Sequence, residues 1–352
     1  MQVGMLNQVS WFNRCRMKAM VLAAPNCVEL SPLIETELQA PQPGPKEVRI
    51  RVEVCGVCRT DLHVVEGELA PHTDHIVPGH EVVGTIDALG PQTSRFQIGD
   101  RVGAAWLYAS CGVCKYCVRG DENLCSSPLF TGYDRNGGYA EFMTALEDFI
   151  YPIPATISAI EAAPFLCAGI IGYRAIKRSN ISPGSPLGLY GFGASAHIVL
   201  QIARHWNCPV YVCTRGNEHQ SLAKSMGSTW VGPADAIPPV KLRSAILFAP
   251  AGELVPVALQ ALDKGGTLSL AGIYMTPIPA MDYDQCLFQE REVRSVTANT
   301  RQDGRDLLQL AAKIPLHAHT TEFPLSDANI ALQKLKHDEV NGAAVLRVSS
   351  AD

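Results

Sequence analysis

Residues 186–206 read PLGLYGFGASAHIVLQIARHW, a short apolar strand, a glycine turn and then the apolar periodicity of a helix. Gly191 permits a tight turn, Gly193 lets the backbone approach a pyrophosphate, and Ala196 is small enough for close helix–strand contact. The N-terminus of the helix offers unpaired N–H donors to an anion. The stretch therefore predicts a dinucleotide-binding turn, and a glycine-rich turn that binds nothing is the alternative.

Strands and helices continue to alternate after this turn. The predicted strands are 209–215, 244–249 and 267–273, and the predicted helices are 218–226 and 253–263. Such alternation is typical of a parallel sheet covered by helices on both faces. We therefore expect an α/β fold whose second part is a doubly wound Rossmann domain. A helix over 327–337 and a strand over 343–348 follow near the C-terminus.

The first part of the chain has a different pattern. Residues 17–105 alternate short β-rich runs, such as 48–54 and 82–86, with Gly and Pro turns. This pattern predicts a small, β-rich, barrel-like domain. Residues 17–22 read as its first strand, so residues 1–16 are predicted to be an N-terminal extension or an over-read translation start.

Size and composition limit the classes of function. The 352 residues suit two domains, and 47% hydrophobic with 18% charged residues describes a compact globular protein. A net charge of −5 gives no basic surface for nucleic acid. No apolar run reaches the length of a membrane span, and residues 1–16 lack a signal-peptide core. We expect a cytoplasmic protein with neither a nucleic acid nor a membrane as partner.

Four of the twelve cysteines are closely spaced in residues 111–125. Cys111, Cys114, Cys117 and Cys125 are separated by two, two and seven residues, and four thiolates can surround one ion tetrahedrally. A closed shell of this kind is a structural zinc site without room for substrate. An iron–sulfur cluster or a redox switch is the alternative.

A second metal site is predicted from residues that lie far apart in the sequence. Cys58 and His80 are ligands of the kind that zinc prefers, and Cys167 is the candidate for the third ligand. Three protein ligands leave one position open for water or substrate, as in catalytic zinc sites. His72 and His75 lie in a polar loop and are expected to be solvated. The other cysteines are predicted to be small buried hydrophobes: Cys15, Cys27, Cys55, Cys208, Cys213 and Cys286.

Over residues 17–348 the chain resembles the zinc-dependent alcohol dehydrogenases of the medium-chain dehydrogenase/reductase superfamily, most closely the short bacterial type. The motifs that carry the resemblance are Cys58-Arg59-Thr60-Asp61-Leu62-His63, Gly79-His80-Glu81, the four-cysteine lobe, Thr131-Gly132-Tyr133-Asp134, Gly137-Gly138-Tyr139-Ala140-Glu141, Cys167-Ala168-Gly169 and Gly191–Ala196.

The resemblance implies a discontinuous, GroES-like catalytic domain with a Rossmann domain inserted in it. The catalytic domain would comprise 17–160 and 305–352, including a structural-zinc lobe at 108–126, and the Rossmann domain would comprise 161–304. The active site would lie between the two domains. Family members are usually homodimers or homotetramers, and no feature of the sequence selects one of these.

The resemblance also implies roles for individual residues. Thr60 matches the hydroxyl that takes the alcohol proton, and His63 matches the far end of the relay. Asp61 and Glu81 match carboxylates near the metal, and Trp106 matches a bulky pocket residue that favours slender alcohols. Three further groups match its metal and coenzyme sites: Cys58, His80 and Cys167 as catalytic zinc ligands; Cys111, Cys114, Cys117 and Cys125 as structural ligands; Arg59, Gly191, Gly193, Ala196, Thr214, Arg215 and Ile273 as coenzyme-binding residues.

General chemistry agrees with these roles. Zinc lowers the pKa of a bound alcohol, and the released proton then needs an exit from a dry pocket. A carboxylate such as Asp61 can orient His80 by accepting its other ring N–H. The alternatives are that Thr60 is a turn residue and that His63 is a surface histidine.

Three departures from the family pattern concern the coenzyme. Thr214, followed by Arg215, stands where NAD-preferring enzymes carry an acidic residue, so we predict a preference for NADP over NAD. Ala343 replaces a final-strand arginine that contacts pyrophosphate in many relatives, although Arg59 and Arg347 remain. Ile171 stands where a threonine often lies near the nicotinamide.

The sequence thus predicts a zinc- and NAD(P)-dependent alcohol dehydrogenase that interconverts a primary or simple secondary alcohol and its carbonyl compound. A cinnamyl-type or polyol dehydrogenase of the same fold is the alternative within enzymes, and Cys167 argues against the polyol branch. A non-catalytic zinc- and nucleotide-binding redox sensor is the alternative of another class.

Overall fold

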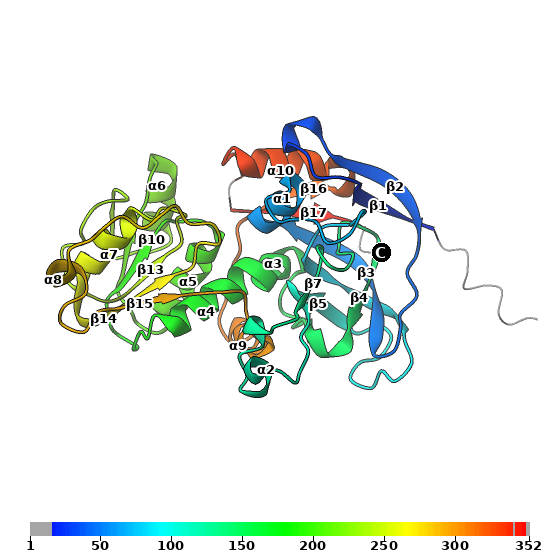
Figure 1. Cartoon of the computed structure of the whole chain (residues 1–352), viewed down its shortest axis with the longest axis horizontal. Helices are drawn as coiled ribbons and strands as arrows, with labels where there is room; N and C mark the ends of the chain where they lie inside the picture. Colours follow the sequence, from blue (N-terminus) through cyan, green and yellow to red (C-terminus); the bar gives the residue numbers. More distant parts are fainter. Residues whose placement is uncertain (1–15, 341, 350–352) are drawn as a thin grey trace, which may run out of the picture.

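The structure is a computed structural model that describes residues 16–340 and 342–349. Its elements form two bodies that lie side by side, each built on its own sheet (Figure 1). The predicted extension, apart from Arg16 at the start of β1, lies outside the described residues, as does Cys15.

The second body is built on a six-stranded sheet in which every neighbouring pair is parallel. The strand order is β12-β11-β10-β13-β14-β15, which is the 3-2-1-4-5-6 order of a dinucleotide-binding fold. The strands are β10 (Leu187–Tyr190), β11 (Val210–Cys213), β12 (Trp230–Gly232), β13 (Leu242–Leu247), β14 (Leu262–Leu270) and β15 (Glu292–Ser295).

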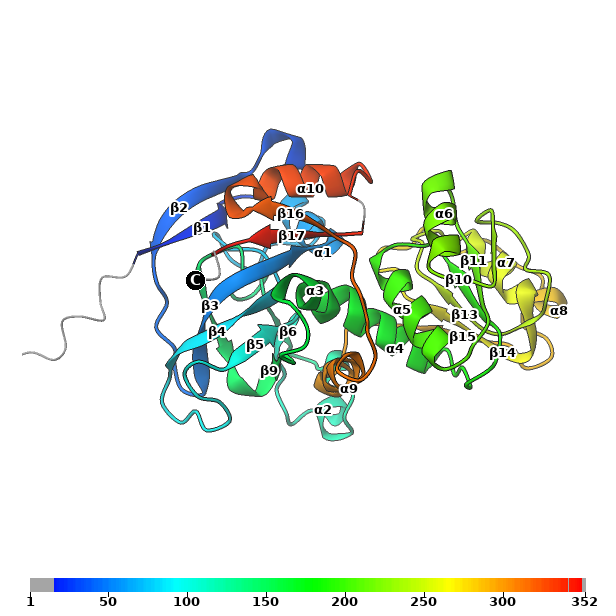
Figure 2. The ribbon, with the colours of Figure 1, turned by 180° about the vertical axis from the view of Figure 1, so that it is seen from behind.

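Helices cover this sheet on both sides (Figure 2). They are α5 (Ala194–His205), α6 (Asn217–Ser225), α7 (Leu254–Ala261) and the short α8 (Tyr283–Cys286). The chain order reverses between β10 and β13, so the glycine turn after β10 lies at the topological switch point where such sheets bind ligands. The predicted Rossmann domain is therefore confirmed, with helix and strand ends shifted by a few residues.

The first body is built on a seven-stranded mixed sheet of order β16-β17-β3-β4-β5-β9, with β8 also paired to β3. Smaller antiparallel pairs, β1–β2 and β6–β7, complete it. The strands are β1 (Arg16–Leu22), β2 (Leu33–Gln39), β3 (Glu47–Val57), β4 (Glu81–Leu89), β5 (Arg101–Ala104), β6 (Leu107–Ala109), β7 (Leu129–Phe130), β8 (Phe142–Leu146), β9 (Ile150–Pro152), β16 (Thr320–Pro324) and β17 (Ala343–Arg347).

Helical segments flank and join the two sheets. Within the first body they are α1 (Arg59–Glu66), α2 (Lys115–Val118), α10 (Ala328–Lys336) and short 3₁₀ turns at Val28–Leu30, Glu122–Leu124, Glu147–Phe149 and Leu325–Asp327. The C-terminal β17 pairs antiparallel with β3, so the chain returns to the first body after the six-stranded sheet. A return of the last strand is what the family resemblance implied.

A continuous helical stretch crosses from the first body to the second (Figure 1). It consists of α3 (Ala159–Pro164), a π-helical turn (Phe165–Gly169) and α4 (Ile170–Arg178), and α9 (Arg301–Ala311) packs beside it. The predicted domain boundaries, 160/161 and 304/305, fall inside α3 and α9. The exact division into domains therefore stays a prediction.

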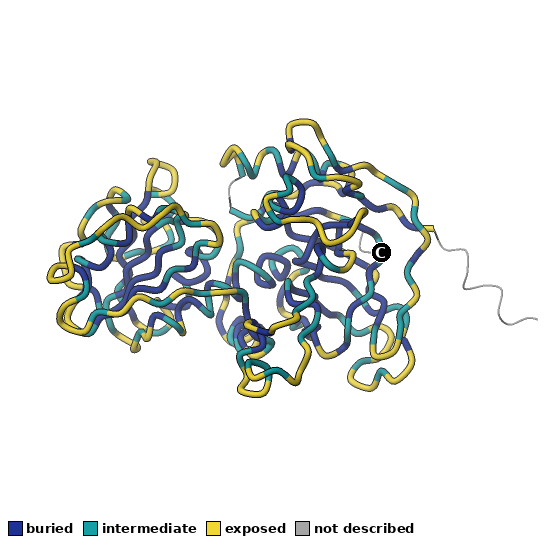
Figure 3. The backbone as a smooth tube through the Cα atoms, in the orientation of Figure 1, coloured by how far each residue is buried: buried dark blue, intermediate teal, exposed yellow. Residues whose placement is uncertain are grey.

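This stretch corrects one expectation from the sequence. Ala159–Arg178 is long and apolar enough to cross a membrane by length and composition, although no such run was expected. In its most apolar window 56% of the residues are buried inside the protein, as in the core helix of a globular fold. Figure 3 shows buried and half-buried segments alternating along the stretch.

Packing explains why the two bodies are joined. One cluster of buried apolar residues contains Val54 and Val83 of the first sheet, Phe165 of the crossing stretch, and Leu187 and Val212 of the second sheet. Each of these side chains is at most 3% exposed. The interior of the crossing stretch therefore belongs to the same core as the central strands of the second sheet.

Candidate active site

The structure brings Cys58, His80 and Cys167 together, although they come from three separate segments. His80 Nε2 lies 3.3 Å from Cys58 Sγ, and Cys167 Sγ lies 3.9 Å from Cys58 Sγ. Two sulfurs bound to one zinc at about 2.3 Å each, at a tetrahedral angle, lie about 3.8 Å apart. The donor set and its spacing therefore fit a zinc ion.

Local structure holds each candidate ligand in place. Cys58 is the N-cap of α1, where its Sγ accepts a hydrogen bond from the backbone N–H of Thr60 at 3.3 Å. His80 is fully buried, directly before β4. Cys167 lies in the π-helical turn, a distortion that is frequent at functional sites.

Asp61 connects two of these ligands. Its Oδ1 lies 3.0 Å from His80 Nδ1 and accepts the backbone N–H of Gly79, while its Oδ2 accepts the backbone N–H of Cys58 at 3.0 Å. The Asp61 side chain is only 2% exposed. It thus orients the His80 ring so that Nε2 points at Cys58.

Glu81 lies close enough to the candidate site to bind a metal ion directly, and not only to support its ligands. One oxygen of its side chain and the ligand atoms of Cys58, His80 and Cys167 all lie within 4.8 Å of one another. A Cβ at Gly56 would collide with this carboxylate, so the glycine makes room for it. Glu81 is therefore placed to be a fourth ligand as well as a supporting carboxylate.

The charges of the site favour a bound cation. The adjacent Cys167 thiol, and His80 after it, lower the pKa of Cys58 well below its usual value despite burial. Burial, with the Cys58 thiolate nearby, raises the pKa of Glu81 well above its usual value. One thiolate is thus already favoured in the site, and a metal ion would compensate the negative charge that accumulates there.

The predicted relay residues lie in α1, directly after Cys58. Thr60 is buried, with a residue exposure of 7%, and the His63 side chain is 17% exposed. His63 Nδ1 is hydrogen-bonded to Glu68, and its ring centroid lies 6.0 Å from that of Tyr274 in the second body. His63 is therefore a partly buried histidine with a carboxylate partner at the boundary of the two bodies.

An aromatic wall extends from the candidate metal site. Trp106 meets the His80 ring edge-on at 5.0 Å and stacks on Phe130 at 4.8 Å and Tyr133 at 6.0 Å, measured between ring centroids. The indole thus links the His80 ring to an aromatic cluster, and its role as a pocket residue stays a prediction.

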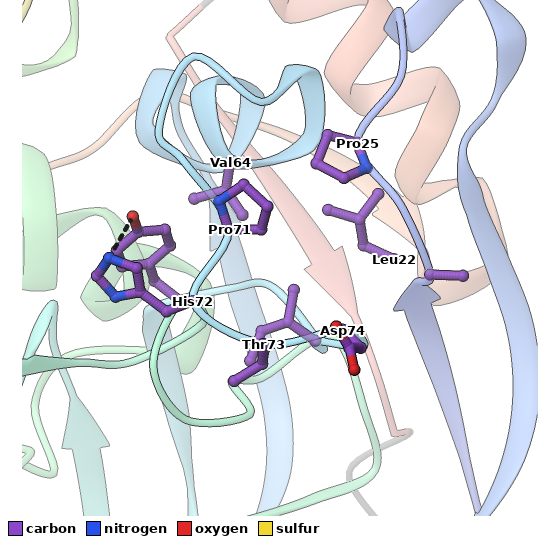
Figure 4. A pocket seen from close by; sticks show the side chains of 10 residues that line it. Leu22, Pro25, Val64, Pro71, His72, Thr73 and Asp74 are labelled. Atoms are coloured by element: carbon purple, nitrogen blue, oxygen red, sulfur yellow. Dashed lines mark hydrogen bonds between the residues drawn. The ribbon is translucent and has the colours of Figure 1, made fainter.

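Tyr133 also lines a hollow, together with His72, Pro71 and Val64 (Figure 4). The loop prediction for His72 was incomplete. Its ring is half exposed, but Nδ1 lies 2.6 Å from Asp134 and Nε2 lies 3.2 Å from the Tyr133 hydroxyl. These contacts give His72 fixed partners, while His75 is exposed.

The four clustered cysteines also come together. Their sulfurs lie within 4.8 Å of one another, with 4.0 Å between Cys111 and Cys117 and 3.6 Å between Cys114 and Cys117. The backbone N–H of Cys117 is the largest of the contacts that lower the pKa of Cys114 to about 5. The donor set fits a structural zinc ion that is closed to substrate.

This lobe is attached to the bodies by polar contacts. Glu122 accepts a hydrogen bond from the backbone N–H of Arg301 at 2.6 Å and pairs with its guanidinium at 2.7 Å. The guanidinium also lies 4.4 Å from the centroid of the Phe149 ring. Asn123 Nδ2 donates to the carbonyl of Thr297 at 2.7 Å. The lobe therefore supports the start of α9 and the segment before it.

The glycine turn has the geometry that a dinucleotide requires. Gly191 has a φ of +89°, and a Cβ there would lie 2.8 Å from the backbone nitrogen of Ala249. A Cβ at Gly193 would meet no protein atom within 4 Å, so the backbone is open there. Ala196 is fully buried. The turn can therefore accept a pyrophosphate against the N-terminus of α5.

The other predicted coenzyme residues are differently placed. Thr214 is buried after β11, whereas Arg215 is exposed. Ile273 was predicted to end a strand, but β14 ends at Leu270, and Ile273 is 64% exposed in the following loop. The strand is shorter because Gly272 follows soon after it, and Gly has a low strand propensity.

The basic groups expected near the pyrophosphate already have partners. Arg59 pairs with Asp338 at 2.5 Å, and Arg347 pairs with Glu322 at 2.5 Å. Ala343 is half-buried at the start of β17, and Ile171 is half-buried in α4. Neither of these two side chains can supply charge to a phosphate.

Several polar residues were not predicted from the sequence, and the predicted burial of one cysteine was wrong. Cys27 is exposed, not buried, because it precedes a 3₁₀ turn at the surface. Cys55, Cys208, Cys213 and Cys286 are buried as predicted. The polar residues that were not predicted from the sequence include Glu68, Glu122, His197 and His319. Of these, only His197 could have been noticed in the sequence, because it lies one turn after the glycine motif.

Comparisons with known proteins agree with this architecture. The family model described as "Alcohol dehydrogenase GroES-like domain" matches residues 44–155, and the model described as "Zinc-binding dehydrogenase" matches residues 196–313. The chain is 48% identical over 337 residues to a probable alcohol dehydrogenase, AdhA, of Mycobacterium tuberculosis, covering 94% of this chain and 97% of the relative. It is 34% identical to an alcohol dehydrogenase of Geobacillus stearothermophilus, covering 90% and 96%.

Solved structures show the same fold. A thermostable alcohol dehydrogenase from Pyrobaculum aerophilum, solved with cobalt and zinc bound, aligns with a TM-score of 0.85 at 25% identity, over 95% of this chain and 100% of that chain. A cinnamyl alcohol dehydrogenase from Sorghum bicolor aligns with a TM-score of 0.85 at 24% identity, over 96% and 99%. With these relatives, the chain belongs to the zinc-type alcohol dehydrogenase family of the medium-chain dehydrogenase/reductase superfamily and is an oxidoreductase that acts on alcohols.

Proposed function

We propose that the chain binds two zinc ions, one catalytic at Cys58, His80 and Cys167 and one structural in the four-cysteine lobe, and transfers hydride between a primary or simple secondary alcohol and a nicotinamide coenzyme. The single observation that carries this proposal is the convergence of Cys58, His80 and Cys167 at zinc-ligand spacing, with Asp61 behind the His80 ring. The family membership supports the same reaction.

The residues of the chain have distinct tasks in this reaction. A zinc ion held by Cys58, His80 and Cys167 would lower the pKa of the alcohol hydroxyl, and a bound nicotinamide would accept the hydride. Thr60 accepts the alcohol proton and passes it towards His63, and the contact between His63 and Glu68 leads the proton to solvent. Trp106 excludes water from one side of the site.

Substrate rates test this function against its alternatives. We expect ethanol and short linear alcohols to be oxidised faster than cinnamyl alcohol or sorbitol, because the indole of Trp106 stands 5.0 Å from the His80 ring. The measurement is kcat/KM for each alcohol with the zinc-loaded enzyme. Faster turnover of cinnamyl alcohol or sorbitol would replace the proposed substrate class, and no alcohol-dependent reduction of either coenzyme would favour the redox sensor.

The coenzyme is proposed to be NADP. Thr214 brings no negative charge to the end of β11, and Arg215 beside it is exposed and can bind a 2′-phosphate. We expect Arg215→Ala to lower the ratio of kcat/KM for NADP to that for NAD by about tenfold, since it removes a charge-assisted hydrogen bond. Lys224→Ala, which removes a positive charge from the far end of α6, is the matched control. A wild-type preference for NAD that Arg215→Ala leaves unchanged would contradict this assignment.

A homodimer is the proposed assembly. Large apolar side chains are exposed in β15 and in the segment just before it, and β15 pairs only with β14 among the described strands, at one edge of the six-stranded sheet: Tyr283, Phe288 and Val293. Exposed apolar surface next to a free strand edge is typical of a contact between subunits. Light scattering after size exclusion should give twice the chain mass. A monomer would contradict the proposal, and a mass of four chains would identify the tetramer.

The cytoplasm is the proposed location. Many unpaired thiols, and two clusters of them at metal-ligand spacing, suit a reducing compartment.

A further inference from the structure

Cys167 is held in place differently from the other two candidate zinc ligands. The Asp61 carboxylate accepts the backbone N–H of Cys58 and contacts the His80 ring, so one buried group orients both. Cys167 lies instead in the π-helical turn of the crossing stretch, Phe165–Gly169. Its Sγ lies 3.9 Å from Cys58 Sγ, and this distance depends on the shape of the turn. The elements packed against the turn therefore decide where the third ligand lies.

Helix α9 packs directly against this turn and beside α4 (Figure 2). Gly169 is buried two residues after Cys167, and a Cβ at Gly169 would lie 2.8 Å from Leu307 Cδ2 of α9. Side chains do not approach each other so closely, so the contact leaves room only for glycine. Leu307 is fully buried in the same apolar cluster as Phe165. Leu307 thus fills the space beside the turn that carries Cys167.

The first body fixes the position of α9 as well. A Cβ at Gly304 of α9 would lie 2.5 Å from the Tyr151 ring of β9, so the helix backbone approaches this ring closely. At the start of the helix, the Arg301 guanidinium pairs with Glu122 of the four-cysteine lobe at 2.7 Å. The helix therefore cannot shift away from the turn without opening these contacts.

A buried ionic network joins α9 to α4, the helix that continues the turn. The Asp303 carboxylate, 2% exposed, accepts hydrogen bonds from Arg174 Nη1 at 2.7 Å and Lys177 Nζ at 3.1 Å. The backbone N–H and the hydroxyl of Thr300 also donate to it, at 3.0 Å and 2.8 Å. Burial raises the pKa of Asp303, but the hydrogen bonds from Thr300 and Arg174 outweigh it and hold this pKa below its usual value. The carboxylate is therefore charged near pH 7.

These contacts lead from α9 to the third ligand. We propose that Asp303 and Leu307 are positioning residues for the catalytic metal: Asp303 fixes α9 on α4, and Leu307 holds the π-helical turn in the shape that directs Cys167 towards Cys58. Both act through the turn. This inference rests on the proposed function, since it assumes a zinc ion at Cys58, His80 and Cys167.

Release of zinc to a chromophoric chelator tests the role of Leu307. We expect Leu307→Ala to release the catalytic zinc about tenfold faster than the unmodified chain, the lower end of the effect of residues that support metal ligands. Leu307→Met conserves the volume and should restore slow release. Leu308→Ala is the matched control, because Leu308 is buried in the same cluster, whereas Leu307 approaches Gly169 most closely. If Leu307→Ala does not fold, Leu307→Val takes its place.

Asp303→Asn tests the ionic network in the same assay. Asparagine keeps the size of the side chain and an acceptor for Thr300, but it leaves Arg174 and Lys177 without their buried charge partner. We expect zinc release to be about tenfold faster here too. Asp306→Asn is the matched control, because Asp306 also pairs with Lys177, at 3.3 Å, but lies nearer the surface. Its zinc release should equal that of the unmodified chain.

The cobalt-substituted protein gives a readout that lower stability alone does not change. Thiolate-to-cobalt charge-transfer absorption depends on both sulfurs reaching the ion. We expect this absorption to be weaker in folded Leu307→Ala and Asp303→Asn, after subtraction of the lobe spectrum recorded with Cys58→Ser. A lower unfolding temperature with unchanged zinc release and an unchanged cobalt spectrum would make both residues structural only.

The outcomes separate this inference from the function on which it rests. If the unmodified chain binds two zinc ions and the Leu307 and Asp303 variants release them equally slowly, the positioning role is wrong and the proposed function stands. If the unmodified chain binds zinc only in the lobe, the proposed catalytic zinc is itself wrong. Equally fast release from Leu308→Ala or Asp306→Asn would contradict a specific role for the two contacts.

Discussion

Replacing Cys58 by serine should lower kcat by at least about 10³-fold while the chain stays folded. A serine hydroxyl is a poor zinc ligand near neutral pH, because it does not ionise as a thiol does. Loss of the metal removes the charge that stabilises the ionised alcohol, an effect of several kcal/mol, and about 4 kcal/mol corresponds to that factor. The measurements are kcat, bound zinc per chain and the unfolding temperature.

The structure explains why this variant should fold. Asp61 accepts the backbone N–H of Cys58, so the start of α1 keeps that hydrogen bond when the sulfur is lost. Asp61 also keeps its contact with His80. Cys27→Ser is the matched control, since Cys27 is an exposed cysteine outside both metal groups. Full activity of the Cys58 variant, or its unfolding, would contradict the proposed role of this residue.

Cys114→Ser should have the opposite profile, with a large loss of stability and a smaller direct effect on chemistry. The lobe has little apolar interior of its own, because the residues of α2 are all at least partly exposed. A bound zinc would therefore supply much of its folding energy. We expect a fall in the unfolding temperature of roughly 5 °C, which corresponds to about 3–4 kcal/mol for a chain of this size.

The loss of stability in Cys114→Ser should extend from the lobe to the neighbouring part of the fold. Glu122 and Asn123 connect the lobe to Arg301 and Thr297, next to α9. Lys115→Ala is the matched control, because it changes an exposed side chain next to Cys114 and leaves every thiol in place. Cys114→Ser and Cys58→Ser should each lose one equivalent of zinc, from different sites, whereas Lys115→Ala should keep both. An unchanged unfolding temperature for Cys114→Ser would contradict a structural metal in the lobe.

Those parts of the molecule that depend on local pattern could be predicted from the sequence. The strand, turn and helix over 186–206 became β10 and α5, because Gly191 needs a positive φ and Ala196 needs a small side chain. The lobe was predictable because four cysteines within fifteen residues can meet without help from the rest of the fold.

Features that depend on long-range packing could not be predicted from the sequence. Glu81 was predicted as a supporting carboxylate, but its closeness to the sulfurs depends on how β4 passes Gly56 of β3. The π-helical turn around Cys167 forms where α3 and α4 join inside the core. His197 and His319 meet only because the chain returns to the first body after the second sheet.

The central claim is that one zinc ion is held by two sulfurs and an imidazole in a site open to the alcohol. The most direct measurement is an anomalous difference map of the crystallised protein at the zinc absorption edge. We expect one peak in contact with Cys58 Sγ, His80 Nε2 and Cys167 Sγ, and a second among Cys111, Cys114, Cys117 and Cys125. A catalytically active, zinc-loaded crystal without density between Cys58, His80 and Cys167 would contradict it.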